Sequence, residues 1–275
     1  MPTYKPNEFW EKSHSHVSPD DVNFGFGIHH VSGGQSNFEA ETLYRLRRLN
    51  ANRVLRKATL PANPKILEIG SGGGYWVEFF QRFLPKVFVG SDLSDTAVER
   101  LSALYPSYEF VAMTSPEEAW SRIRQRGPYD LVFAIDVLYH ITDEEVWKST
   151  LHNLCANTAA SGQILMADYF YEQPTDNPSA VHVKFRTMQT YLDILDQHGF
   201  VTEAVQPIFY FMNRTVSGPW RDHNRLLSPA LRFLSSNRLG LRFLGSIDAI
   251  LTAFLRPMNS RSKTRFLLAR KAASA

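Results

Sequence analysis

The chain has 275 residues, 44% of them hydrophobic and 13% aromatic, with a formal net charge of +3. This length suits one large α/β domain or two small ones, and the composition excludes a disordered chain. The single cysteine, Cys155, excludes an intramolecular disulfide framework and a multi-cysteine zinc site. The first residues show no signal-peptide pattern and no apolar run approaches the roughly 20 residues of a membrane span, so we expect a cytoplasmic protein.

Residues 1–60 are predicted to form an N-terminal helical extension. A polar lead rich in His and Asn comes first. Over 38–59, apolar residues such as Leu43, Leu46 and Leu49 then recur near the helical period. This segment ends before Pro61, where the pattern of the chain changes.

Strand and helix signals alternate over residues 61–212, the predicted core domain. The pattern predicts strands at 65–69, 87–91, 108–112, 131–135, 163–167 and 205–211. It predicts helices at 75–84, 95–104, 116–126, 143–155 and 188–197, the fourth with Thr142 or Asp143 as its N-cap. Several strands are unbroken apolar runs, as is typical of a parallel sheet that helices cover on both faces.

A helical insertion is predicted over 213–263, before a last strand at 264–270 in the C-terminal segment 264–275. The insertion contains Ile247, Ile250, Leu251, Phe254 and Leu255, which are spaced for one apolar face of a helix. Such a helix would pack on the domain, lie in a membrane interface or form a dimer surface. With this last strand, the chain is predicted to be α/β, with a doubly wound, mostly parallel seven-stranded sheet that binds ligands beyond the carboxyl ends of its strands.

Basic charge is concentrated in the C-terminal part of the chain. Residues 214–271 contain twelve Lys and Arg against two acidic residues, whereas the remainder has 18 basic and 25 acidic residues. This segregation either indicates an anionic partner, such as a phosphate, an acidic glycan, a membrane surface or nucleic acid, or it serves solubility.

The stretch KILEIGSGGGYW, residues 65–76, places four glycines in five positions directly after the first predicted strand. A dinucleotide fingerprint would need a third glycine where Tyr75 stands. A P-loop would need Lys followed by Ser or Thr, where Tyr75 and Trp76 stand. Neither phosphate-binding motif fits, so the glycines serve another ligand or only a tight turn.

The remaining pattern, E-x-G-x-G-x-G from Glu68, resembles the first motif of the class I S-adenosylmethionine-dependent methyltransferases, and the similarity extends through much of 64–200. Asp92 ends the second strand, where that family has an acidic residue that holds the ribose hydroxyls; a carboxylate can accept two hydrogen bonds from a diol. YDLVFAIDVLYHI at 129–141 resembles the family's fourth strand and following loop, and FRTMQTYLDILDQHGF at 185–200 its penultimate helix.

The resemblance implies a Rossmann-like methyltransferase fold, S-adenosyl-L-methionine as cofactor and an N-terminal lid. The chain lacks the acidic residue that many members carry after the third strand, so the adenine would contact backbone, Thr114 or Ser115, with Met113 as an apolar wall. The cofactor-binding residues implied by the resemblance are Glu68, Gly70, Ser71, Gly72, Gly74, Asp92, Leu93, Met113, Thr114, Asp136 and Val137.

His140, in the loop after the fourth strand, is the predicted catalytic residue. A hydroxyl acceptor must lose a proton, and an imidazole titrates near neutral pH, although a packing role for His140 is an open alternative. Asp136 would face the methionine amino group or the substrate, or cap the loop. The predicted substrate-binding residues, which follow the fourth and fifth strands, are Tyr139, Tyr169, His182 and Arg186.

The N-terminal lead contains His14, His16, His29 and His30, but no flanking carboxylate or cysteine completes a ligand pattern, so we expect no metal site. We expect Phe9, Trp10 and the stretch 33–47 to shape the substrate pocket and its cover.

The predicted function is O-methylation of a small molecule, sugar or glycan, with an anionic acceptor favoured by the arginines. Nucleic acid is not expected as a partner, because the chain has no separate RNA-binding module and no base-methyltransferase motif, whereas the basic 214–271 segment would suit the inner surface of a membrane. The alternatives are an N-methyltransferase, a nucleic-acid methyltransferase, or a protein that binds S-adenosylmethionine without catalysis.

Overall fold

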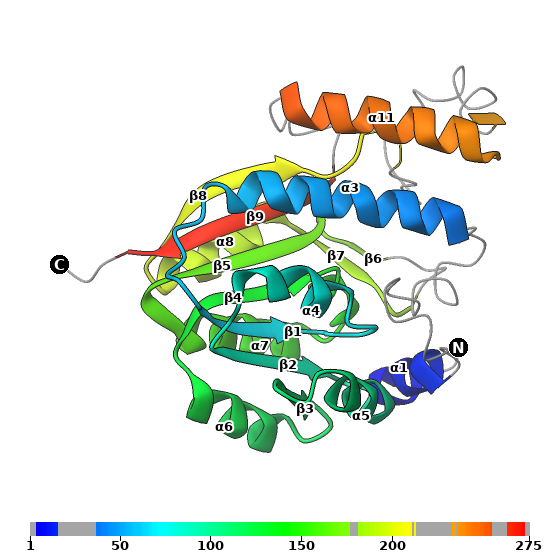
Figure 1. The fold of residues 1–275 in the computed structure, drawn as a ribbon. Helices are drawn as coiled ribbons and strands as arrows, with labels where there is room; N and C mark the ends of the chain where they lie inside the picture. The colour runs from blue at the N-terminus through cyan, green and yellow to red at the C-terminus, as the bar shows by residue number, and fades with distance from the viewer. Residues whose placement is uncertain are drawn as a thin grey trace.

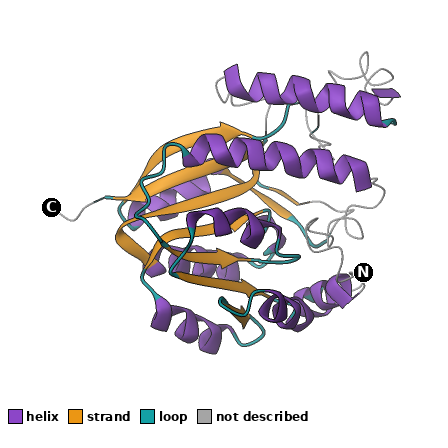
Figure 2. Cartoon of the chain, viewed as in Figure 1, coloured by secondary structure: helices purple, strands orange, loops and turns teal. Residues whose placement is uncertain are grey.

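The computed structural model describes residues 4–15, 37–176, 181–210, 212, 233–234, 236–254 and 263–272. Its central layer is a sheet in which seven strands follow the order β3-β2-β1-β4-β5-β9-β8 (Figures 1 and 2). The first five run parallel, and β9 is antiparallel to both β5 and β8. These strands are β1 (Lys65–Ile69), β2 (Val87–Asp92), β3 (Glu109–Ala112), β4 (Tyr129–Ile135), β5 (Thr158–Tyr171), β8 (Phe200–Pro207) and β9 (Thr264–Lys271).

The predicted doubly wound, mostly parallel sheet is confirmed, with differences at its margins. β5 is much longer than predicted, and its end pairs with β7 (Lys184–Thr187), which in turn pairs with β6 (Thr175–Asp176). Neither short strand was predicted. The strand predicted at 205–211 is wrong in its bounds: β8 begins at Phe200, directly after the turn at Gly199, and ends at Pro207.

Helices cover both faces of the sheet. Each face has its own apolar core. Side chains of α3 (Asn37–Leu55), α4 (Tyr75–Phe80) and α5 (Asp95–Leu104) belong to one core. Side chains of α6 (Pro116–Arg126), α7 (Glu144–Asn157) and α8 (Met188–Gln197) belong to the other. Ser94, Asp143 and Thr187 cap the first turns of α5, α7 and α8 with their side chains, which accept backbone hydrogen bonds.

Helix α11 (Arg238–Phe254) lies on α3 as an outer layer (Figure 1). Its buried face is formed by Gly240, Leu241, Leu244, Gly245, Asp248 and Thr252. Of the residues predicted to form one apolar face, Ile250 and Phe254 are exposed, Ile247 and Leu251 are partly buried, and Leu255 lies outside the described residues. This face is therefore not packed on the domain as a whole. Small residues let the helices approach: a Cβ at Gly245 would lie 2.9 Å from Cγ2 of Thr42.

Much of the predicted insertion, including 213–232 and 255–262, lies outside the described residues. Within the described part of the chain, every helix is too short or too polar to cross a bilayer.

Candidate functional site

The glycine loop, residues 70–74, turns between β1 and α4 at the carboxyl end of the sheet. Gly70, Gly72 and Gly74 have φ angles of 78°, 51° and 84°, a region that favours glycine. At Gly70 a Cβ would also lie 2.3 Å from Cγ2 of Val137, so the loop after β4 packs directly on bare backbone. At Gly72 the nearest atom to a Cβ would be Cε1 of His14, at 3.7 Å. The loop is thus shaped both by its turn and by close neighbours.

Glu68 stabilises this loop through a side-chain hydrogen bond. The residue is buried, and its Oε2 accepts a hydrogen bond from Oγ of Ser71 at 2.9 Å. Burial raises the pKa of Glu68 to about 8; the Ser71 hydrogen bond opposes this rise and the charge of Asp92 adds to it. Glu68 is therefore mainly protonated at pH 7, and it fixes the loop through Ser71.

Asp92 ends β2 and faces the glycine loop. Its Oδ2 accepts from the backbone N–H of Gly72 at 2.8 Å, and its Oδ1 accepts from that of Ser94 at 3.0 Å. The N–H of Met113 donates to the backbone oxygen of Asp92 at 2.8 Å, which ties the loop after β3 to the end of β2. Each carboxylate oxygen of Asp92 keeps a further lone pair that a hydroxyl can use.

Asp136 follows β4 with a φ of 59°, an uncommon value for a residue other than glycine. Its N–H donates to the oxygen of Ala167 at 3.0 Å. Arg47 of α3 forms a buried ion pair with it: Nε lies 2.5 Å from Oδ2 and Nη2 lies 3.1 Å from Oδ1. The guanidinium also lies over the ring of Phe209. Arg47 therefore compensates the charge of Asp136 within the protein itself.

His140 ends the helical turn η3 (Leu138–His140), and its Nδ1 lies 3.1 Å from the backbone oxygen of His182. Because a carbonyl oxygen only accepts, Nδ1 carries the hydrogen and Nε2 is the acceptor. Burial lowers the pKa of His140 to about 3, so the ring is neutral at pH 7.

Helix α1 (Pro6–Ser15), which was not predicted, brings aromatic rings to His140. Trp10 meets His140 edge to face, with ring centroids 4.7 Å apart. Phe9 stacks on His182 at 4.9 Å, and His182 in turn stacks on His140 at 5.5 Å. These rings form a continuous aromatic wall.

Glu11 attaches α1 to the start of α5 (Figure 1). Its Oε2 accepts from Oγ of Ser94 at 2.7 Å, and its carboxylate also bonds to the side chain of Thr96. His14, one turn further along α1, is buried, and its Nδ1 has no hydrogen-bond partner among the described residues. Burial lowers the pKa of His14, which favours a neutral ring.

These groups surround a cavity of about 980 Å³, and Pro6, Asn7, Trp10 and His14 of α1 form part of its lining. The volume lies at the upper end of the range for small-molecule sites. The predicted site residues that line the cavity are Gly70, Ser71, Gly72, Asp92, Leu93, Met113, Thr114, Asp136, Val137, Tyr139 and His140.

The structure places the other predicted residues behind this lining. Glu68 and Gly74 shape the loop, and His182 and Tyr169 support the rings of His140 and Tyr139. Arg186 is buried under Trp147, and it donates to Oε2 of Glu144 and to the oxygen of Ile141. Its guanidinium thus holds loops together.

The charge of the lining does not favour the predicted anionic acceptor. Arg124 is the one Lys or Arg in the described lining, against five carboxylates: Asp92, Glu117, Asp136, Asp143 and Glu145. The expectation of an anionic acceptor followed from the C-terminal charge and from Arg186. Arg186 is buried outside this lining, and six of the twelve basic residues of 214–271 lie outside the described residues.

No group of three or more His, Cys, Asp or Glu side chains with metal-binding geometry occurs among the residues that the structure describes. His16, His29 and His30 lie outside that part of the chain.

Residues 42–205, more than half of the chain, match a family model described as a methyltransferase domain. The chain belongs to this methyltransferase family. With the strand order above, the match identifies it as a class I S-adenosylmethionine-dependent methyltransferase, as the motifs predicted. A comparison with curated proteins finds no match.

Similar solved structures share the fold at low identity. Magnesium protoporphyrin IX methyltransferase from Synechocystis PCC 6803, with bound SAM, is 13% identical at a TM-score of 0.51, over 99% of this chain and 100% of that one. An N1-methyltransferase of 1,6-didemethyltoxoflavin from Burkholderia thailandensis is 13% identical at 0.50, over 99% and 92%. The [4+2]-cyclase SpnF is 13% identical at 0.52, over 83% and 81%.

The cavity of this methyltransferase fits S-adenosylmethionine. Glycine backbone faces it at Gly70 and Gly72, and the Asp92 carboxylate is oriented toward the same space, as a ribose diol requires. Met113 also lines this cavity.

Two contacts of the methyltransferase site could not be predicted from the sequence. The pairing of Arg47 with Asp136 joins residues 89 positions apart, although Arg47 falls within the stretch 33–47 that was expected to shape the pocket. Glu11 lies 83 positions from Ser94, in a lead without helical periodicity. The one local signal at that contact is Ser94, which can be predicted from the sequence as the N-cap of α5.

Proposed function

We propose that this methyltransferase transfers a methyl group to the hydroxyl of an uncharged, ring-bearing small molecule, such as an aromatic compound or a sugar. The observation that carries the proposal is the cavity beside His140, whose lining includes Trp10 and other residues of α1. A cavity of this size suits a small acceptor better than a nucleic acid or a long glycan. The described lining has one arginine against five carboxylates, which disfavours an anionic acceptor, and the aromatic rings offer faces for stacking.

The residues of the cavity divide the work of such a transfer. The bound cofactor supplies an activated methyl group on a positively charged sulfur. Asp92 and the glycine loop hold the nucleoside, and the aromatic wall orients the acceptor ring. His140 would accept the hydroxyl proton at Nε2, so that the acceptor oxygen can take up the methyl group that the cofactor would supply. Because the oxygen becomes strongly acidic as it gains the methyl group, a weak base suffices.

The direct test is a labelled-methyl transfer screen with hydroxyl- and amine-bearing ring compounds, followed by mass spectrometry to locate the methyl group. Methylation at oxygen is the expected result. Methylation only at nitrogen, or only of RNA with a steep salt dependence, would replace the proposed acceptor. Binding of S-adenosylmethionine in calorimetry without transfer to any acceptor would favour a non-catalytic role.

Replacing His140 separates its two proposed roles. His140→Ala is expected to lower turnover by about 10²–10⁴-fold while it leaves cofactor affinity nearly unchanged. Because the pKa of His140 is lowered to about 3, its contribution to turnover in the wild type should stay constant between pH 5 and pH 8 and fall only in stronger acid. His152→Ala, on α7, is the control. Unchanged turnover in His140→Ala would reduce this residue to a packing role.

We also propose a cytoplasmic location, which the free, buried thiol of Cys155 supports.

A further inference from the structure

Helix α11 is apolar on the side that faces away from the protein as well as on the side that faces α3. Four large side chains on its outward side are highly exposed: Leu239 by 78%, Phe243 by 56%, Ile250 by 58% and Phe254 by 82%. Their spacings of four, seven and four residues place them in one stripe along the helix. We call these four residues the outer stripe. A helix that is apolar on all sides is normally covered on all sides, so the outer stripe needs an occupant.

The chemistry around the outer stripe is basic. The one acidic residue of α11, Asp248, is buried and accepts hydrogen bonds from the backbone N–H groups of Tyr210 and Met212. Arg238 and Arg242 lie on the same helix as the stripe, toward its beginning. The solvent-facing side of α11 therefore combines apolar and positively charged groups and has no carboxylate of its own.

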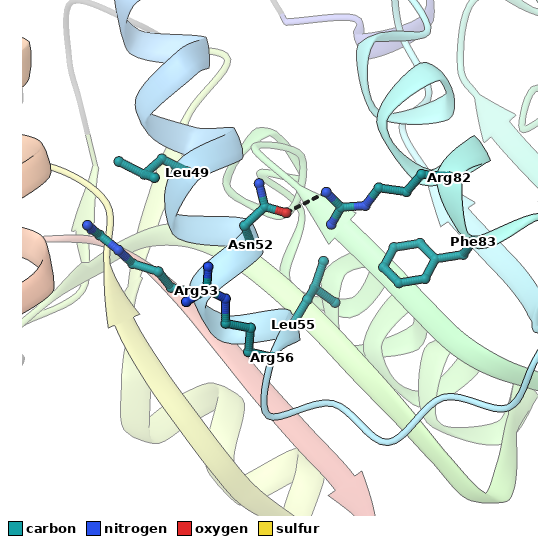
Figure 3. Close-up of a pocket in the computed structure, with 7 residues that line it drawn as sticks. All are labelled: Leu49, Asn52, Arg53, Leu55, Arg56, Arg82 and Phe83. Carbon is teal, nitrogen blue, oxygen red and sulfur yellow. Dashed lines mark hydrogen bonds between the residues drawn. The ribbon is translucent and has the colours of Figure 1, made fainter.

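A second basic feature adjoins the far end of α11. A surface pocket of about 650 Å³ lies between the end of α3 and the helical turn η2 (Gln81–Phe83), and Arg53, Arg56 and Arg82 line it (Figure 3). Arg53 links this pocket to α11, because it donates to Oγ1 of Thr252 and to the oxygen of Ala249, both at 2.9 Å.

The pocket is distinct from the cofactor cavity. Its lining, which also includes Leu49, Asn52, Leu55 and Phe83, contains no acidic residue. The pocket lies between the end of α3, which precedes β1 along the chain, and η2, which precedes β2, whereas the cavity lies at the carboxyl ends of the strands. Arg82 lies on the side of α3 away from α11, and Arg53 is the pocket arginine that contacts α11 (Figure 3).

We infer that α11 docks this methyltransferase onto an anionic lipid bilayer. The outer stripe enters the boundary between headgroups and acyl chains, as the apolar face of an amphipathic interfacial helix does. Arg238 and Arg242, at the beginning of the helix, add attraction to a negatively charged surface. Charge selects this occupant, because a second copy of the chain would present the same basic surface.

Vesicle co-sedimentation of the full chain tests the inference. The wild type is expected to sediment with vesicles of phosphatidylcholine and phosphatidylglycerol but not with phosphatidylcholine alone. Phe243→Ser and Phe254→Ser should each weaken binding at least about tenfold. Arg242→Gln, at an exposed residue of α11, should weaken it about fivefold. The matched controls are Leu104→Ser, at an exposed leucine of α5, and Lys148→Gln on α7, and both should bind as the wild type does.

Three results would overturn the inference. The first is no binding to anionic vesicles, and the second is equal loss in Phe254→Ser and Leu104→Ser. The third is a concentration-dependent dimer in sedimentation velocity that the phenylalanine substitutions dissociate, which would assign the stripe to a second copy. Calorimetry with S-adenosylmethionine, without vesicles, shows that each variant is folded. Vesicle binding does not depend on the acceptor, so the proposed methylation can fail while this inference stands.

Discussion

The two halves of the cofactor cavity are built from different material. The half formed by the glycine loop and Asp92 consists of backbone and one oriented carboxylate, all within a short stretch of chain around β1 and β2. The half around His140 consists of aromatic side chains that come from α1 and from the loops after β4 and β6. We call them the backbone half and the aromatic half.

Because of this difference, substitutions in the two halves should have different effects. Backbone conformation determines the shape of the backbone half, so a single added atom there should abolish ligand binding. Tertiary packing determines the aromatic half, so changes there should alter stability or turnover and leave the affinity for the cofactor largely intact.

The largest effect is expected at Gly70. Gly70→Ala would place a methyl group at positive φ and 2.3 Å from Val137, so cofactor binding should fall at least about 100-fold in calorimetry, with a stability loss of a few kcal/mol. Gly199→Ala is the control, because its φ is also positive, at 73°, but no atom lies within 4 Å. Adding Val137→Ala to Gly70→Ala should restore part of the binding. Cofactor affinity in Gly70→Ala within threefold of the wild type would contradict this account.

The next effect concerns stability in the aromatic half. Arg47→Met leaves the buried carboxylate of Asp136 without its partner, which should cost about 3–5 kcal/mol in urea denaturation. The double variant Arg47→Met with Asp136→Asn should recover much of that loss, because no charge stays buried. Arg45→Met, two residues earlier in an exposed pair with Glu41, should change stability by less than about 1 kcal/mol. Equal losses of stability in Arg47→Met and Arg45→Met would show that the buried ion pair contributes no more to stability than the exposed one.

The sequence predicted the backbone half well because its signals are local. The helices at 95–104, 116–126 and 188–197 have the predicted bounds, since Ser94, Pro116 and Thr187 mark their first turns. The glycine loop and Asp92 line the cavity as the motif predicted.

The aromatic half and α11 could be predicted only in part. Arg47 and Asp136 are brought together by the whole fold, and no local pattern marks their pairing. Periodicity alone could not tell which side of α11 is covered by α3, because that helix carries apolar residues on both sides.

An effect that depends on pH is expected at Glu68, which hydrogen-bonds to the glycine loop. Burial raises the pKa of Glu68 from 4.5 to about 8, so the folded protein keeps a proton that the unfolded chain releases. The free energy of unfolding should therefore fall as pH rises from about 4.5 to about 8, by several kcal/mol at roughly 1.4 kcal/mol per pKa unit. Glu68→Gln should remove this decline and be the more stable protein at pH 9. Exposed Glu118→Gln on α6 should follow the wild type, and parallel curves for Glu68→Gln and the wild type would contradict the buried proton.

Substitution of Asp92 should have the smallest effect. It tests most directly whether the two halves act independently. Asp92→Ala removes a carboxylate that orients the loop and can accept from a diol, so cofactor affinity should fall at least about tenfold while turnover at saturating cofactor changes little. Trp10→Ala should do the reverse, because the ring of Trp10 packs on the ring of His140. Exposed Asp95→Ala, in the first turn of α5, is the control for a lost charge nearby. If Asp92→Ala and Trp10→Ala lower the affinity for the cofactor equally, the two halves act as one unit, and α1 holds the nucleoside as well as the acceptor.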